Sequence, residues 1–197
     1  TYVAKFTEKA DVTINYVANE GGKVSRANDT VAPATGNVAE KVTAEPISNE
    51  YRFVNWTVDG KVVSENAELD VVTINLNAKE NGIYKATTFT ANFEKKAKFD
   101  VTGTIDNGNV TNGSQKVIEG EHSEAIVFTA ENGYYIKEVK VNGTAVTDLD
   151  ENAESYTFAA LEKVMGNVTV EAVTAEKQSV INYTAEIGGY VSNTTEK

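Results

Sequence analysis

The chain has 197 residues, with 18 lysines and arginines against 29 aspartates and glutamates, and its formal net charge is −11. Nucleic acids and anionic membrane surfaces are bound mainly by cationic side chains, so this composition argues against both partners. No apolar run approaches the roughly 20 residues that insertion into a membrane requires. Without cysteine and with one histidine, the sequence excludes disulfides, thiolate chemistry and multi-histidine metal sites.

An internal repeat organises the chain. Residues 1–25 align without a gap on residues 168–192, residues 50–60 resemble 133–143, and residues 1–6 resemble 88–93. Similarity at fixed spacing is the sign of tandem modules. We therefore expect four segments: the last strand of a preceding module in 1–9, module A in 10–96, module B in 97–176 and the start of a third module in 177–197. Because the chain opens at Thr1 without a signal segment, we expect it to be a piece of a longer protein.

The joins between modules are short. Residues 94–96 and 175–177 are too few to act as flexible linkers, so neighbouring modules should lie close together. In tandem arrays each module contacts mainly its sequence neighbours. We therefore predict two small β-rich modules in an elongated arrangement, with adjacent repeats of the same chain as their first partners.

Alternation of apolar and polar residues predicts strands at the start of each module. In module A, Val12, Ile14 and Tyr16 alternate with polar residues, and residues 20–23 turn the chain. In module B the first strand, over 99–105, leads to Asp-Asn-Gly at 106–108, which predicts a β-hairpin.

The central strand of each module carries a shift of one residue. Tyr51 and Phe53 have one parity and Trp56 and Val58 the other, and the same shift recurs in module B. A β-bulge would keep all of them on one face. Asp-Gly at 59–60 and Asn-Gly at 142–143 then predict two-residue hairpins. The predicted core consists of Ile14, Tyr16, Tyr51, Phe53, Trp56, Val58, Phe93, Tyr134, Ile136, Val139 and Val141.

Helical signal is weak. Phe158, Leu161, Val164 and Met165 have the spacing for one or two turns, which Gly166 would end, and module A has nothing comparable. The fold class that we predict is therefore mostly β.

Four motifs of module A resemble the bacterial tandem modules known as InlB B-repeats, in their divergent form. They are Gly-Gly-Lys-Val-Ser at 21–25, Thr-Ala-Glu-Pro at 43–46, Tyr-Arg-Phe-Val-Asn-Trp at 51–56 and Thr-Phe-Thr-Ala-Asn-Phe at 88–93. Module B departs from the pattern, with Val139 in place of Trp, Asn132 in place of Pro and Gly-Asn-Val-Thr at 108–111 in place of the Gly-Gly motif. The resemblance implies a β-grasp-like sheet with a short helix, in secreted or wall-anchored proteins, with no catalytic residues and no cofactor.

One acidic stretch has the spacing of metal ligands. Asp148, Asp150, Asn152 and Glu154 alternate like the first ligands of a calcium loop, but the EF-hand also needs Gly at position six and Glu at position twelve. Alanines occupy both positions, at 153 and 159. We therefore favour a polar loop without a metal over a calcium site.

Other candidate groups are few. Tyr135 and Tyr190 are the aromatic residues with the best prospect of contacting a ligand, whereas Trp56 belongs to the predicted core. His122 has no oriented nucleophile in its sequence context, so it predicts no acid–base catalysis. An isopeptide bond would need a buried Lys, Asn and carboxylate, which sequence alone does not place.

These observations predict a non-catalytic spacer from the stalk of a bacterial surface protein, outside the cell. The alternative is an adhesion module that binds a glycan or a host surface protein. Exposed aromatic residues lining one groove would favour the alternative.

Overall fold

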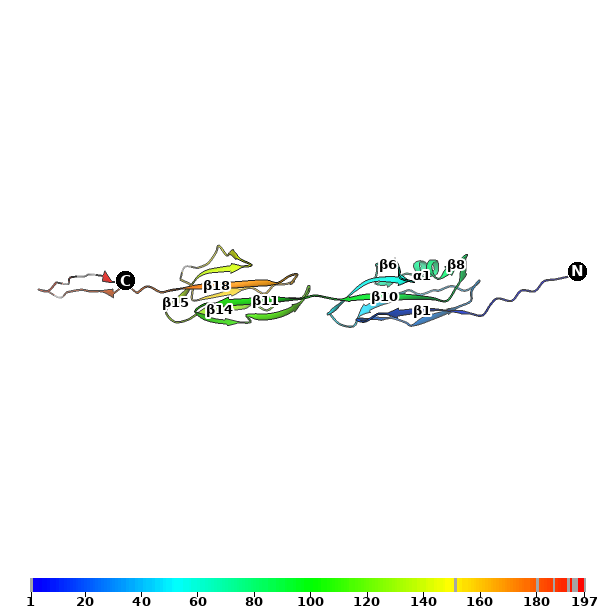
Figure 1. The fold of residues 1–197 in the computed structure, drawn as a ribbon, viewed down its shortest axis with the longest axis horizontal. Coiled ribbons are helices and arrows are strands. Elements are labelled where there is room, and N and C mark those ends of the chain that lie inside the picture. Colours follow the sequence, from blue (N-terminus) through cyan, green and yellow to red (C-terminus); the bar gives the residue numbers. More distant parts are fainter. Residues whose placement is uncertain are drawn as a thin grey trace. The chain divides into compact units, whose positions relative to one another are not determined.

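The computed structural model describes residues 2–150, 152–179, 181–185, 187–190, 192 and 195–196. The chain divides into two compact units, Thr1–Lys96 and Ala97–Lys197, which contain module A and module B. Each is built mostly of β-strands arranged in small sheets (Figure 1).

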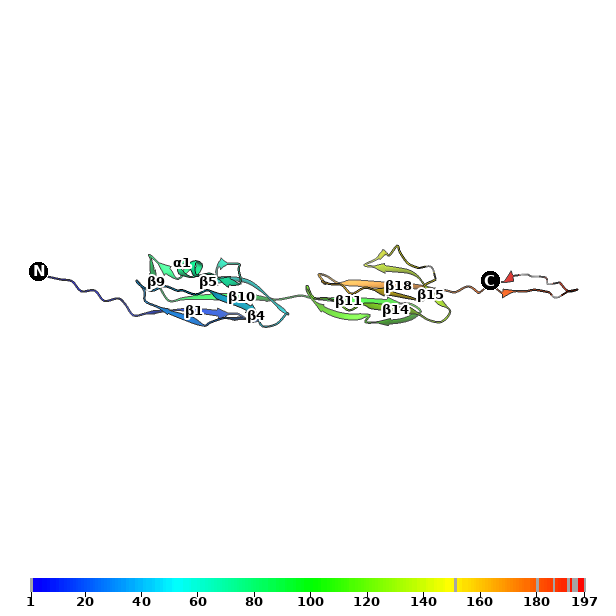
Figure 2. The same cartoon turned by 180° about the vertical axis from the view of Figure 1, so that it is seen from behind.

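Module A has a five-stranded sheet in the order β3-β1-β10-β5-β6 and a three-stranded sheet in the order β2-β4-β7. A hairpin, β8–β9, and one helix, α1, complete it, and α1 lies next to β6 and β8 (Figures 1 and 2). The elements are β1 Val12–Ala18, β2 Gly22–Val24, β3 Asn28–Val31, β4 Val42–Pro46, β5 Tyr51–Val58, β6 Lys61–Ser64, β7 Glu68–Leu69, α1 Val71–Asn77, β8 Lys79–Glu80, β9 Ile83–Tyr84 and β10 Thr87–Lys95.

Module B repeats this plan with no helix among its described residues, and its sheets have the orders β13-β11-β18-β15-β16 and β12-β14-β17. Its strands are β11 Lys98–Ile105, β12 Gly108–Thr111, β13 Ser114–Ile118, β14 Ile126–Ala130, β15 Tyr134–Val141, β16 Thr144–Ala145, β17 Ser155–Phe158 and β18 Val168–Glu176. In the segment where a third module was expected to begin, β19 (Ile181–Asn182) pairs with β20 (Thr195–Glu196).

The first and last strands of each module run in parallel, side by side. In module A, β1 pairs with β10 from Ile14 opposite Thr87 to Ala18 opposite Ala91. In module B, β11 pairs with β18 over a stretch of the same length. Because parallel strands point the same way, the chain enters each module at one end of the main sheet and leaves it at the other.

A polar side chain fastens the last strand just beyond each parallel pair, and we call this contact the clasp. In module A, Asn19 Oδ1 accepts from the Phe93 amide (2.7 Å) and Asn19 Nδ2 donates to the Phe93 carbonyl (3.2 Å). In module B, Asp106 Oδ1 accepts from the Thr174 amide (2.9 Å) and hydroxyl (2.7 Å). The clasp extends the contact between first and last strands past the sheet hydrogen bonds.

Each module has its own apolar core. Among the predicted core residues, Ile14, Tyr16, Trp56, Phe93, Ile136 and Val139 are buried, and Tyr51, Phe53, Val58, Tyr134 and Val141 are partly buried. The buried indole keeps its polar atom satisfied, because Trp56 Nε1 donates to the Ala67 carbonyl (3.2 Å). Buried polar groups that find a partner in this way cost little stability.

The β-bulge that the sequence predicted is confirmed in both modules. Along β5 the pairing with β10 passes from Phe53 to Asn55 and leaves out Val54, while along β15 it leaves out Lys137. Both two-residue hairpin turns are confirmed as well. Asp59-Gly60 and Asn142-Gly143 have positive φ at all four residues, as type I′ turns require.

The hairpin predicted at 106–108 is wrong. The strand after the turn, β12, pairs with β14 in the second sheet and not with β11, and the turn at 20–23 likewise leads into β2, which pairs with β4. At Gly108 a Cβ would lie 2.3 Å from the Thr129 carbonyl oxygen, so glycine here allows β12 to approach β14 closely. The turn therefore carries the chain from one sheet to the other.

The short helix was predicted in the wrong module. The described helix lies in module A at Val71–Asn77, while Phe158 ends strand β17 and Val164 lies in an irregular segment bonded to Gly120 and Glu121. The residues of α1 have modest helix propensity, but the Asp70 side chain caps the Thr73 amide (2.9 Å) and Ile74 is fully buried. Tertiary packing thus stabilises a helix that periodicity alone does not indicate.

Residues 2–9, which make up the expected last strand of a preceding module apart from Thr1, form no strand, and Thr1 lies outside the described residues. A β-strand needs a neighbouring strand to pair its backbone N–H and C=O groups. Among the described residues no strand lies beside this segment. Instead the Glu8 carboxylate accepts from the amides of Ala34 (2.6 Å) and Thr35 (3.0 Å) and from the Thr35 hydroxyl (2.8 Å).

The glycine pair of module A makes room for two aromatic rings. A Cβ on Gly21 would lie 2.1 Å from the Tyr51 ring, and one on Gly22 would lie 1.9 Å from the Phe93 ring. In module B the register around the bulge places Thr174 where module A has Phe93. There the turn contacts the last strand through a hydrogen bond from Asn107 Nδ2 to the Thr174 hydroxyl (2.9 Å).

The substitution Gly22→Ala should destabilise module A by about 1–3 kcal/mol, because the added methyl group overpacks against the Phe93 ring. The double variant with Phe93→Thr should lose less stability than the sum of the two single variants, since the ring that clashes is gone. Urea unfolding followed by Trp56 fluorescence measures this, because Trp56 is the only tryptophan and reports on module A. Strict additivity of the two losses would contradict the proposed contact.

Candidate functional site

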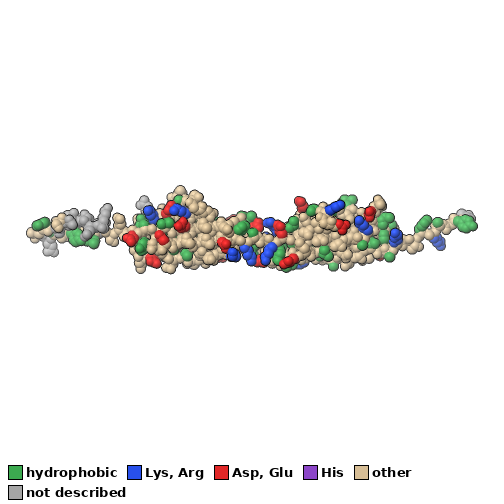
Figure 3. Space-filling model, viewed as in Figure 1, with side chains coloured by type: hydrophobic (Ala, Val, Ile, Leu, Met, Phe, Trp, Pro, Cys, Tyr) green, Lys and Arg blue, Asp and Glu red, His purple; other side chains and the backbone are tan. Residues whose placement is uncertain are grey.

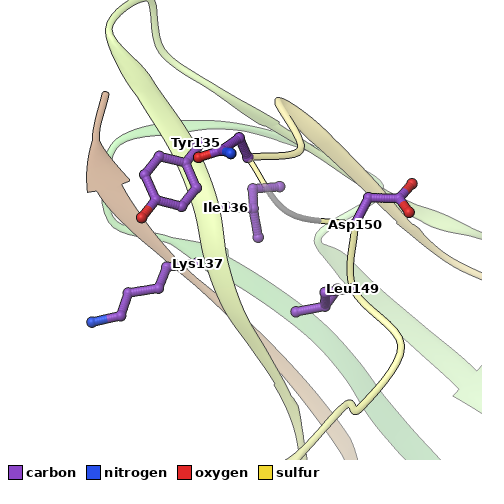
Figure 4. Close-up of a pocket in the computed structure, with 6 residues that line it drawn as sticks. Tyr135, Ile136, Lys137, Leu149 and Asp150 are labelled. Atoms are coloured by element: carbon purple, nitrogen blue, oxygen red, sulfur yellow. The ribbon is translucent and has the colours of Figure 1, made fainter. Parts of the chain in front are cut away.

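The candidate site is a hollow of about 360 Å³ beside the first half of β15 in module B (Figure 4). In this view Tyr135 and Lys137 lie at one edge, Asp150 lies at the opposite edge and Ile136 points toward Leu149 between them. The lining residues are Tyr135, Ile136, Lys137, Leu149, Asp150 and Asn152.

The hollow exists because β15 has a strand neighbour along only part of one edge. The hairpin strand β16 pairs with that edge at Lys140 and Val141. Along the first half of β15 the loop after β16 takes the place of a strand. This loop is tied to β15 by a hydrogen bond from the Ile136 amide to the Ala153 carbonyl (2.8 Å). The β-bulge at Lys137 lies in the same stretch of β15, so the bulge residue itself lines the hollow.

The central and last strands of the two modules carry different facing residues beside the hollow. In module A, Arg52 on β5 lies opposite Glu94 on β10 and forms an ion pair with it. In module B, Tyr135 lies opposite Ala175, which is too small to cover the tyrosine ring. The ring is consequently half-buried and lines the hollow.

The four residues of the acidic stretch are divided by the structure. Asp150 and Asn152 line the hollow, Asp148 does not, and Glu154 is ion-paired with Lys177. This ammonium group lowers the pKa of the Glu154 carboxyl. Within the described residues no group of three or more His, Cys, Asp or Glu side chains is arranged to hold a metal ion.

The other candidate groups lie apart from the hollow. Tyr190 is 91% exposed in the segment after module B, and His122 is exposed in a loop. The buried polar residues of the described chain are Thr87, Ser123 and Thr174. An isopeptide bond, which needs a buried lysine and asparagine, therefore has no pair of partners among them.

The chemistry of the hollow suits binding. Ile136 and Leu149 supply apolar surface, and Tyr135 supplies an aromatic ring at the rim. Lys137 offers hydrogen-bond donors, and Asp150 on the other side offers acceptors. The sequence drew attention to Tyr135 and to the acidic stretch but not to Lys137 or Leu149, although the parity shift along the central strand marks Lys137 as the bulge.

Comparison with known families finds a match for module A. Residues 12–97 match the family model described as the divergent InlB B-repeat domain, a repeat domain of bacterial surface proteins. No curated protein matches the chain significantly. The described part of the chain has no helix that is long and apolar enough to cross a membrane.

The ion pair between Glu154 and Lys177 predicts a pH effect of known sign. A carboxyl whose pKa is lower in the folded state stabilises the fold above its unfolded pKa, and this contribution is lost as the pH falls through the folded pKa. A carbon-detected NMR titration should give Glu154 a pKa below that of an ordinary glutamate, and Lys177→Ala should raise it. An unchanged value in the variant would show that the ion pair does not form in solution.

Proposed function

We propose that this chain, whose first module is a divergent InlB B-repeat domain, is a non-catalytic spacer in a secreted or wall-anchored bacterial surface protein. One observation carries the proposal, namely the parallel pairing of the first and last strands in each module. A module built in this way receives the chain at one end of its sheet and releases it at the other. Each further module then adds length, as a spacer requires.

The length added by one module follows from its last strand. Strands β10 and β18 each have 9 residues, which at about 3.3 Å per residue gives roughly 30 Å. The two residues at the boundary between the units are each hydrogen-bonded within their own unit. The Lys96 amide donates to the Glu50 carbonyl (2.8 Å), and the Ala97 carbonyl accepts from the Glu119 amide (2.8 Å). Little of the chain at the boundary is left to act as a flexible linker.

The surface charge also favours a spacer. Acidic and basic side chains are interspersed on the face drawn in Figure 3. Ion pairs such as Lys23–Glu45, Lys41–Glu68 and Lys116–Asp100 join side chains that are about half exposed or more, and such pairs add little stability. The net charge of −11 keeps neighbouring copies apart by repulsion and so discourages lateral association.

Small-angle scattering of the whole chain tests the spacer proposal. We expect a distance distribution with a maximum dimension well beyond that of a single globule of the same length, whose radius of gyration would be about 16 Å. A chain carrying one further copy of residues 12–176 should be longer by about 60 Å, two modules at roughly 30 Å each. A distribution that fits one compact globule would overturn the proposal.

A second candidate function is adhesion through module B to a glycan or a host surface protein. The hollow beside β15 favours it, because an aromatic ring flanked by an ammonium and a carboxylate group is suited to sugar rings, whose apolar faces stack on aromatics and whose hydroxyls accept and donate hydrogen bonds. The negative net charge disfavours polyanionic glycans, so neutral sugars are the better candidates.

A glycan array probed with the whole chain tests adhesion. We expect retention on neutral glycans that is lost in Tyr135→Ala and kept in the matched variant Tyr190→Ala. Loss in Tyr190→Ala alone would place the contact after module B and reject the hollow. Absence of retention on every glycan would reject this second function and leave the spacer proposal unaffected.

A further inference from the structure

The same parallel pairing determines how a module responds when its ends are pulled apart. Tension enters module A through the start of β1 and leaves through the end of β10, which lie at opposite ends of two adjacent strands. The two strands are then pulled in opposite directions along their own axes. Force of this kind shears the hydrogen bonds between them and does not open them from one end.

Shear is the direction in which a strand pair is strongest. The hydrogen bonds of a parallel pair are evenly spaced along the strands, so a shearing force is shared among all of them at once. If the same strands were peeled from one end, the bonds would carry the load one at a time and break in sequence. The unfolding rate under force depends on this barrier and not on the equilibrium stability.

From this geometry we infer a further function: each module is a mechanical clamp that bears tension along the chain. In module A the clamp is the parallel pair from Ile14 and Thr87 to Ala18 and Ala91. In module B the pair β11–β18 has the same role. This function goes beyond spacing, because a spacer needs only separated ends and a clamp needs ends that load the strands in shear.

The clasps strengthen the clamp at the point where it would begin to slip. Asn19 holds both backbone groups of Phe93, and Asp106 holds the amide and hydroxyl of Thr174, in each case beyond the last paired residues. A relative slide of the strands by one residue would break these contacts together with the sheet hydrogen bonds. The clasp therefore adds its bonds in parallel with those of the sheet.

Most of the module is shielded from the load while the clamp holds. Residues 19–86 connect β1 to β10 and include the second sheet, α1 and the central strand β5. The load passes directly from β1 to β10 and bypasses this connection. We therefore expect module A to unfold in one step once its clamp fails, because β10 is also the partner of β5.

The absence of cysteine allows the pulling axis to be chosen by design. Three exposed alanines serve as attachment points after substitution by cysteine. The pair Ala10→Cys and Ala97→Cys pulls the clamp of module A in shear. The pair Ala10→Cys and Ala86→Cys pulls on the same ends of β1 and β10 and so peels them apart.

Single-molecule force spectroscopy at one pulling speed compares the two variants. Both should lengthen by about 250 Å per event, at about 3.4 Å of extended chain per residue released, so the same unfolding is compared. We expect a several-fold higher unfolding force along the shear axis. Equal forces along both axes would overturn the inference, whatever the scattering experiment shows about the spacer.

The clasp is tested by Asn19→Ala along the shear axis, with Ile74→Val as the control, since Ile74 is buried in α1 and its truncation destabilises module A without contacting Asn19 or Phe93. We expect Asn19→Ala to lower the shear force more than the control when both are compared at equal loss of stability in urea. Urea unfolding followed by Trp56 fluorescence shows that each variant is folded before it is pulled. A force that falls only in proportion to stability would overturn the role of the clasp.

Discussion

The rest of each module depends on the parallel hydrogen-bonded pair between its first and last strands. Two parallel neighbours cannot be joined by a tight turn, so the chain must travel back along the sheet before the last strand begins. The segment between β1 and β10 makes this return through the second sheet and the antiparallel strand β5. The turns after β1 and β11 lead the chain out of the main sheet because both places beside the first strand are taken, one by the last strand and the other by β3 or β13.

The sequence predicts the parts of this fold that have a local signature. Alternation marks the strands, the parity shift marks the bulges at Val54 and Lys137, and Asp-Gly and Asn-Gly mark the two type I′ turns. Turn chemistry alone does not say which strand receives the chain afterwards, and this is why the hairpin predicted at 106–108 is absent. The helix α1 escapes prediction for a related reason, because its stability comes from the burial of Ile74.

The candidate site is predictable only in part for the same physical reason. Tyr135 and the acidic stretch attract attention as residue types, but their meeting at one hollow depends on the loop after β16, which sequence does not place. Comparison of the two modules is more informative than either alone. Where module A has the ion pair of Arg52 and Glu94, module B has Tyr135 and Ala175 on the corresponding strands, and the difference opens the surface.

These paired differences have a consequence for folding fidelity. Neighbouring modules of similar sequence are prone to exchange strands as they fold, and the product is a misassembled pair. A last strand exchanged into module A would bring Thr174 to the place of Phe93, over the bare glycines, and Ala175 opposite Arg52. The reverse exchange would bring Phe93 against Asn107 and break its bond to the Thr174 hydroxyl. Each last strand thus fits its own module better than its neighbour, and divergence between adjacent repeats protects a tandem protein from misassembly.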